Sequence, residues 1–189
     1  MPGTQAIVTA VALLPAVWVA GGLALGSLGA NPIETVTHVT GEWTLRFLLV
    51  CLAITPARRW FHQPWLAPYR RTFGLLAFGY GCLHLSTWLA LDWFFDWGAI
   101  WEDIVERPFV TAGMASFLCM LPLAATSTRR SMQRLGRRWI SLHRLAYVAA
   151  SLGVLHYLWL VKADLLAPGI HGAVLLALLV ARLGPPKRT

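Results

Sequence analysis

The sequence predicts an all-α membrane protein, a single domain of six transmembrane helices over residues 1–189 with both termini in the cytoplasm. Hydrophobic residues make up 57% of the 189 residues and charged residues only 13%, whereas soluble domains carry about 25% charged residues. The mean hydropathy of +0.60 agrees with this class. Because a membrane helix takes about 20 residues, the length holds six or seven helices with short loops and leaves no room for a separate catalytic domain.

The expected transmembrane helices are six apolar stretches separated by short polar connections. They cover residues 6–28, 32–55, 69–91, 108–125, 139–161 and 169–182. No basic side chain precedes the first stretch, so we expect a retained helix rather than a cleaved signal peptide. Asn31-Pro32 is typical of a helix start, because Asn caps helices and Pro suits the first helical position, and we expect Pro56 to end the second helix.

Charged connections bound the later helices. The third lies between an arginine-rich loop and Asp92, and the fourth begins at Pro108. The fifth follows a second arginine-rich loop and ends before Lys162, while the sixth runs from Gly169 to Arg182. Ionisable side chains are costly inside the hydrocarbon layer, so these charges indicate where each crossing ends.

The distribution of charge predicts the orientation. Twelve basic residues fall on one side of the six-helix arrangement: Arg58, Arg59, Arg70, Arg71, Arg129, Arg130, Arg134, Arg137, Arg138, Arg182, Lys187 and Arg188. The connection between the third and fourth helices carries five acidic residues against Arg107 alone. The positive-inside rule places the twelve in the cytoplasm, as in a multi-pass protein of the bacterial inner membrane. This accounts for the net charge of +8 without nucleic-acid binding, and the same loops could also hold anionic membrane lipid.

The tryptophans beyond the third helix and the three cysteines are both interpreted as structural residues. Trp93, Trp97 and Trp101 recur every four residues beyond the third helix, which is typical of an amphipathic segment at the outer interface. The three cysteines are isolated within apolar runs. We therefore expect small buried residues rather than disulfides, structural zinc or an iron–sulfur cluster.

Histidines within the apolar stretches are the candidate functional residues. At about 1.5 Å per residue, His38, His84 and His156 lie about 10, 12 and 9 Å from the outer ends of their helices. His143 lies close to the cytoplasmic boundary instead, and it is 13 residues from His156, which places the two about 140° apart around an ideal helix. Three imidazoles at matched depth in an apolar bundle each need a partner for their ring nitrogens.

Two imidazoles on different helices can bind a haem iron from both sides. The macrocycle also needs small neighbours, and the third and fifth helices supply them: Gly74, Gly79, Gly81, Ala149, Ala150 and Gly153. The alternative is that each histidine only bonds to a carbonyl or hydroxyl group of a neighbouring helix. A second constellation lies on the second helix, where Glu34, His38, Glu42 and Arg46 recur every four residues. It is either an intrahelical ion pair beside a boundary glutamate or a polar groove that binds propionates or a quinone, with His38 relaying protons.

The chain resembles the MsrQ (YedZ) family in four stretches that span most of its length. They are NPIETVTHVTGEW at 31–43, RRTFGLLAFGYGCLHL at 70–85, TSTRRSMQRLGRRWISLHRLAY at 126–147 and VLHYLWLVK at 154–162. The resemblance implies a fold like that of ferric reductase and NADPH oxidase transmembrane domains, in which the third and fifth helices carry two histidines each. His84 and His156 match the outer pair. An inner haem on His143 lacks its partner, because Arg70 stands fourteen residues before His84.

The family also implies a function: the haem-binding membrane subunit of a periplasmic methionine sulfoxide reductase system. By this resemblance we expect a cytochrome with one or two b haems that transfers electrons to a soluble molybdopterin-containing partner, rather than a catalytic subunit. Quinone or a cytoplasmic flavin reductase would be the donor, with FMN as a family cofactor. The alternatives are a stand-alone ferric or quinone reductase, and a non-redox proton or metal-ion transporter. If quinol enters in the outer half, His143 has only a capping or hydrogen-bonding role.

Overall fold

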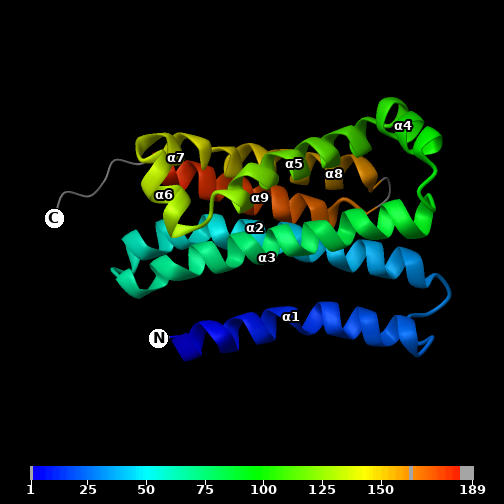
Figure 1. The fold of residues 1–189 in the computed structure, drawn as a ribbon, viewed down its shortest axis with the longest axis horizontal. Coiled ribbons are helices and arrows are strands. Elements are labelled where there is room, and N and C mark those ends of the chain that lie inside the picture. Colours follow the sequence, from blue (N-terminus) through cyan, green and yellow to red (C-terminus); the bar gives the residue numbers. More distant parts are fainter. Residues whose placement is uncertain (1, 162–163, 184–189) are drawn as a thin grey trace.

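The computed structural model describes residues 2–161 and 164–183, and within them the protein is a bundle of helices that run along one long axis (Figure 1). The long elements are α1 (Pro2–Ala24), α2 (Pro32–Trp60), α3 (Ala67–Thr87), α5 (Pro108–Ala125), α8 (Leu145–Leu160) and α9 (Leu166–Leu183). The short elements are η1 (Pro64–Leu66), the π-helical turn η2 (Trp88–Asp92), α4 (Trp97–Glu106), α6 (Arg129–Leu135) and α7 (Arg137–Leu142).

The helices agree with a membrane protein. Four helical segments in the described part of the chain are long and apolar enough to cross a membrane: Gly3–Ala24, Pro32–Trp60, Pro64–Asp92 and Pro108–Ala125. Helix α8 has 16 residues, and Leu166–Arg182 is a shorter apolar helix. Six crossings, with both termini in the cytoplasm, therefore stay a prediction.

The basic and acidic connections lie at opposite ends of the bundle. The turn between α2 and α3, the helices α6 and α7, and the last turn of α9 are at the end where α1 begins (Figure 1). Helix α4, with most of the acidic residues of its connection, is at the other end (Figure 1). This arrangement brings together the segments that carry the arginines expected in the cytoplasm.

Helix α2 is the most buried helix and packs mainly on α3, while α5 packs mainly on α8. Tyr80 of α3, which is only 1% exposed, connects this core to α1. Its hydroxyl donates to the carbonyl oxygen of Ala12 at 2.8 Å and accepts from the backbone N–H of Ala16 at 3.1 Å. One side chain thus satisfies both partners of an intrahelical bond in α1, which fixes the position of that helix.

The expectation that Pro56 ends the second helix is wrong, because α2 continues to Trp60. Proline has no backbone N–H, so the carbonyl four residues earlier loses its donor. That carbonyl belongs to Leu52, and the guanidinium of Arg182 on α9 donates to it and also to the hydroxyl of Tyr147. A side chain from another helix therefore replaces the missing bond.

The stretch predicted as one helix from residue 139 to 161 is divided in the structure. Helix α7 ends at Leu142 and α8 begins at Leu145. Around the junction the N–H groups of Arg144 and Ala146 bond to carbonyls three residues earlier rather than four. This tightened turn changes the angular relation of His143 to the rest of the helix, so the angle expected for an ideal helix does not apply.

Candidate functional site

A cavity of about 550 Å³ lies between α2, α3, α5 and α8 and extends to α4. Its volume is in the range of sites that bind small molecules and cofactors. The wall facing the middle of the bundle is apolar, with Leu45, Leu48, Phe117 and Met120. Polar and charged side chains line the end beside α4.

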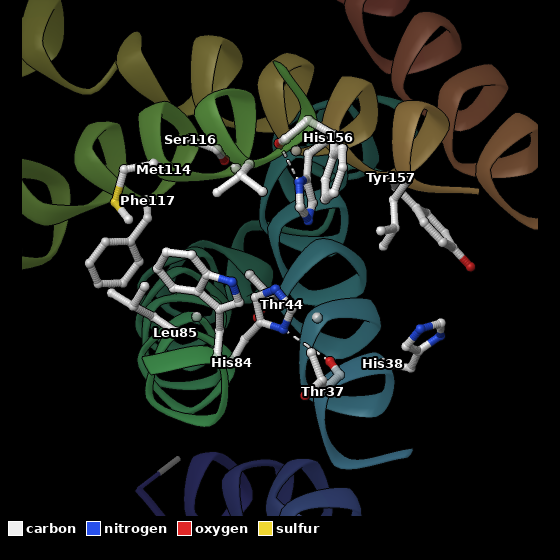
Figure 2. Close-up of a pocket in the computed structure, with 18 of the residues that line it drawn as sticks. Thr37, His38, Thr44, His84, Leu85, Met114, Ser116, Phe117, His156 and Tyr157 are labelled. Atoms are coloured by element: carbon white, nitrogen blue, oxygen red, sulfur yellow. Dashed lines mark hydrogen bonds between the residues drawn. The ribbon is translucent and has the colours of Figure 1, made fainter. Parts of the chain in front are cut away.

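His84 of α3 and His156 of α8 face one another across this cavity (Figure 2). Nδ1 of His84 lies 2.9 Å from the carbonyl oxygen of Thr37, and Nδ1 of His156 lies 2.7 Å from that of Phe109. A carbonyl oxygen only accepts, so each Nδ1 carries the proton and each Nε2 keeps its lone pair. Figure 2 shows these two free nitrogens pointing toward each other. Hydrogen bonds of this kind orient histidines that bind metals.

The separation of the rings suits a single metal ion between them. Their centroids are 6.1 Å apart, with the ring planes at 74°. Two metal–nitrogen bonds of about 2 Å each span about 4 Å, and the distance from each nitrogen to its own ring centre accounts for the remainder. An imidazole ligates through the lone pair of Nε2, which lies in its own ring plane and points along the metal–nitrogen bond, so the angle between the two ring planes does not oppose binding.

The donor set fits a haem better than a free metal ion. Within residues 2–161 and 164–183, no group of three or more His, Cys, Asp or Glu side chains is placed to hold a metal. A zinc site needs at least three protein ligands, whereas a haem brings its own ring nitrogens and needs only axial ligands. Two histidines with apolar walls are sufficient for haem.

Two glycines on opposing helices leave space for the imidazoles. A Cβ atom at Gly41 of α2 would lie 3.0 Å from Cε1 of His84, and one at Gly113 of α5 would lie 2.8 Å from Nδ1 of His156. Either side chain would displace the ring it meets. The small residues expected from the sequence are only partly at the site: Gly81 and Gly153 line the cavity, but Gly74, Gly79, Ala149 and Ala150 do not.

Sequence reasoning missed Gly41 and Gly113. A signal was present, because glycine costs a helix about 1 kcal/mol relative to alanine, and both glycines lie inside predicted transmembrane helices. What the sequence lacked was a reason to pair either glycine with a histidine on another helix.

The cavity is also lined by Glu34, His38 and Glu42 of α2, but not by Arg46, and these side chains do not join the two facing histidines. His38 lies apart from them (Figure 2), with its side chain 49% exposed and Nε2 3.9 Å from a Glu34 oxygen. Glu42 pairs with Arg46 and accepts a hydrogen bond of 3.2 Å from the hydroxyl of Tyr157. The structure therefore supports both interpretations of these α2 residues, since the Glu42–Arg46 ion pair forms and polar side chains of α2 line a groove.

His143 lies outside the cavity, near the end of the bundle that carries α6 and α7. In the described part of the chain, the ring that stacks on it is Trp139, with centroids 3.8 Å apart. Its Nδ1 is 3.1 Å from the carbonyl oxygen of Trp139. The structure does not bring His143 together with His84 and His156.

An ion pair with a buried carboxylate at the outer end of the cavity was also missed. Asp103 of α4 is 4% exposed, its Oδ1 lies 2.8 Å from Nε of Arg107, and Nε1 of Trp88 donates to its Oδ2 at 3.3 Å. The sequence signal was the spacing of four residues between the aspartate and the arginine.

Comparison with known proteins agrees with this architecture. The profile of the family described as "Ferric reductase like transmembrane component" matches residues 40–154, which include the facing histidine of α3 and most of α8. No solved structure matches the chain.

Relatives of known name match almost the whole chain. A protein of Rhodospirillum rubrum named protein-methionine-sulfoxide reductase heme-binding subunit MsrQ is 55% identical, over 93% of this chain and 85% of its own length. Proteins of the same name from Caulobacter vibrioides and Deinococcus radiodurans are 50% and 48% identical, each over 93% of this chain and over 84% and 87% of their own lengths. By these matches and by the fold around the two facing histidines, the chain belongs to the MsrQ family of ferric-reductase-like transmembrane proteins.

Proposed function

We propose that the cavity holds one haem b with His84 and His156 as its two axial ligands, and that the protein transfers electrons across the membrane. The observation that carries this proposal is the pair of free Nε2 atoms facing each other, with ring centroids 6.1 Å apart. Haem supplies one-electron transfer when it is bound, and the protein supplies ligation, orientation and the electrostatic environment. The relatives named as heme-binding subunits support haem as the ligand.

The chain's own residues perform the binding and the orientation. The carbonyl oxygens of Thr37 and Phe109 hold each imidazole in the tautomer that leaves Nε2 free to ligate. Gly41 and Gly113 allow the rings to approach α2 and α5 closely. The apolar wall lowers the local dielectric constant beside the macrocycle, which influences the reduction potential.

The partner is proposed to be a periplasmic, molybdopterin-containing methionine sulfoxide reductase. The support is the name of the relatives, which describes a subunit of a protein-methionine-sulfoxide reductase, together with the family resemblance. The cavity reaches the end of the bundle that carries α4, the end expected to face the periplasm. An acceptor docked there would lie on the side nearest the two histidines, where transfer is shortest.

The proposed electron donor is either the quinone pool of the inner membrane or a cytoplasmic flavin reductase. This proposal, and FMN as a further cofactor, rest on the family resemblance. A second haem at His143 is part of the same proposal only if the donor acts at the cytoplasmic face. In that case a carrier is needed near His143, because the hydrocarbon layer is about 30 Å thick.

The test uses purified His84→Ala and His156→Ala variants, with His62→Asn as the control. His62 lies in a turn with a positive φ of 53°, a conformation that asparagine tolerates. We expect the control to keep the haem to protein ratio and the spectrum of a bis-imidazole haem, and both alanine variants to lose them. His84→Gly with added imidazole should recover the spectrum, because the free ligand can occupy the emptied position. Normal haem content in both alanine variants would contradict the assignment, and absence of a Soret band from the unmodified protein would favour a transporter.

A further inference from the structure

The two ends of the cavity differ in chemistry, and this difference determines where the carboxylates of the ligand can lie. This inference rests on the proposed function, because it takes haem b as the ligand. A haem has an apolar macrocycle with two propionate carboxylates on one edge. Burying a carboxylate among apolar side chains is strongly unfavourable unless it is paired. The apolar wall at Leu48 and Met120 therefore cannot receive the propionate edge, which must lie toward α4.

The carboxylates that line the cavity would repel that edge, and one lining residue attracts it. Three carboxylates line the α4 end, Glu34, Asp92 and Asp103, and a fourth, Glu42, lines the cavity and pairs with Arg46. Among the described lining residues, the guanidinium of Arg107 is the permanent cation, while His38 is the titratable group on the same side. The electrostatic attraction for an incoming carboxylate thus depends mainly on Arg107.

Arg107 is held in place by a buried partner. The side chain of Asp103 is 2% exposed and that of Arg107 is 56% exposed. Nε of Arg107 lies 2.8 Å from Oδ1 of Asp103, although the contact is not aligned as a hydrogen bond. In the described part of the chain, the side chain of Arg107 forms an ion pair with Asp103. A guanidinium has five N–H donors, so the terminal nitrogens of Arg107 remain available to another acceptor.

We propose that Arg107, positioned by Asp103, binds the haem propionates and sets the orientation of the haem in the cavity. Arginine suits this role because its planar fork makes charge-assisted, bidentate hydrogen bonds to carboxylates. Asp103 is a positioning residue: it fixes the Nε side of the guanidinium, and Trp88 in turn donates to Asp103. This ion pair, at the junction between α4 and α5, then joins α4 to the ligand site.

The test separates recognition of the carboxylates from binding of the macrocycle. The full chain is produced in a haem-deficient host and titrated in detergent with haem b, and separately with the dimethyl ester of the same haem, which has no free carboxylate. Arg107→Gln should weaken haem b binding by about tenfold, as expected for hydrogen bonds to charged groups. Its affinity for the ester should remain within about twofold of the unmodified protein. Arg107→Lys should give an intermediate loss, because it keeps the charge without the fork.

Removing Arg107 alone leaves Asp103 as a buried unpaired charge, which can prevent folding. The double variant Asp103→Asn with Arg107→Gln removes both charges and should show the same discrimination between haem and ester. Glu106→Gln is the matched control, since Glu106 lies on the same turn of α4 and does not line the cavity. It should leave both affinities unchanged.

The outcomes are distinguishable. Equal weakening of haem b and the ester in the double variant would show a role in the packing of the α4–α5 corner and would overturn the inference. No weakening of either would do the same, while the bis-imidazole spectrum of the unmodified protein would leave the proposed function intact. A protein that binds haem b without that spectrum would refute the ligand pair itself, and the inference with it.

Discussion

Replacing Gly113 by alanine tests whether the close approach of α5 to the His156 ring is needed for ligation. The new Cβ would lie 2.8 Å from Nδ1, 3.0 Å from Cε1 and 3.2 Å from Cγ of His156, all closer than an ordinary van der Waals contact. The atoms it meets belong to a ring that is held by a hydrogen bond of 2.7 Å to Phe109. The ring must therefore move by several tenths of an ångström, and that bond must lengthen or break.

The expected loss can be worked from these contacts. A lost hydrogen bond costs about 1 kcal/mol, which is about a fivefold loss of affinity. Loss of an outer partner of a metal-binding histidine costs about 10- to 100-fold. We expect Gly113→Ala to weaken haem binding by about 10- to 100-fold, measured as the rate of haem transfer to excess apomyoglobin and as haem content after purification.

Another glycine supplies a matched control. A Cβ at Gly79 would meet nothing within 4 Å, and Gly79 does not line the cavity. Gly79→Ala should therefore keep the haem. If Gly113→Ala retains haem as well as Gly79→Ala does, the close packing behind His156 is not required and the reasoning is refuted.

Three further predictions concern stability, topology and the inner histidine. Arg182→Met should lower the thermal midpoint in detergent by the equivalent of about 1–3 kcal/mol, because it leaves the Leu52 carbonyl unpaired. The same change made together with Pro56→Ala should cost less, because alanine returns a backbone N–H donor. An equal loss with Pro56 and with Ala at position 56 would contradict the idea that Arg182 replaces the missing hydrogen bond. A reporter inserted within residues 129–138 should read as cytoplasmic and one near Asp96 as periplasmic, and the reverse pattern would overturn the orientation. His143→Ala should remove about half of the haem, with the bis-imidazole spectrum intact, if this residue ligates an inner haem, whereas an unchanged haem to protein ratio would assign it the stacking role seen on Trp139.

Much of the site could be predicted from residue type and position. Histidines are rare in apolar helices because burying their polar rings is costly, so His84 and His156 were identifiable, and their similar depth followed from the helix ends. The same reasoning selected His38, which lines the cavity but does not face the pair, since depth gives no information about rotation around the helix axis. The family resemblance separated these cases where the physical pattern alone left them equal.

The errors in the predicted helix boundaries have physical causes in other parts of the chain. Pro56 was expected to end the second helix, which is correct for an isolated segment. The helix continues because Arg182, 126 residues later in the sequence, donates to the carbonyl that proline leaves free. A local rule fails when a distant side chain supplies the missing partner.

The sequence by itself determined the membrane class and the grouping of basic connections, because these depend on transfer free energies that each residue carries individually. The two histidines were selected by residue type and depth together with the family resemblance. The tertiary structure decided which atoms meet: the glycines behind the rings, the carbonyls of Thr37 and Phe109 that orient them, and the Asp103–Arg107 pair beside the cavity. These contacts depend on the rotation and axial shift of each helix against its neighbours. Both are set jointly by the packing of all the side chains, so no single segment of the sequence specifies them.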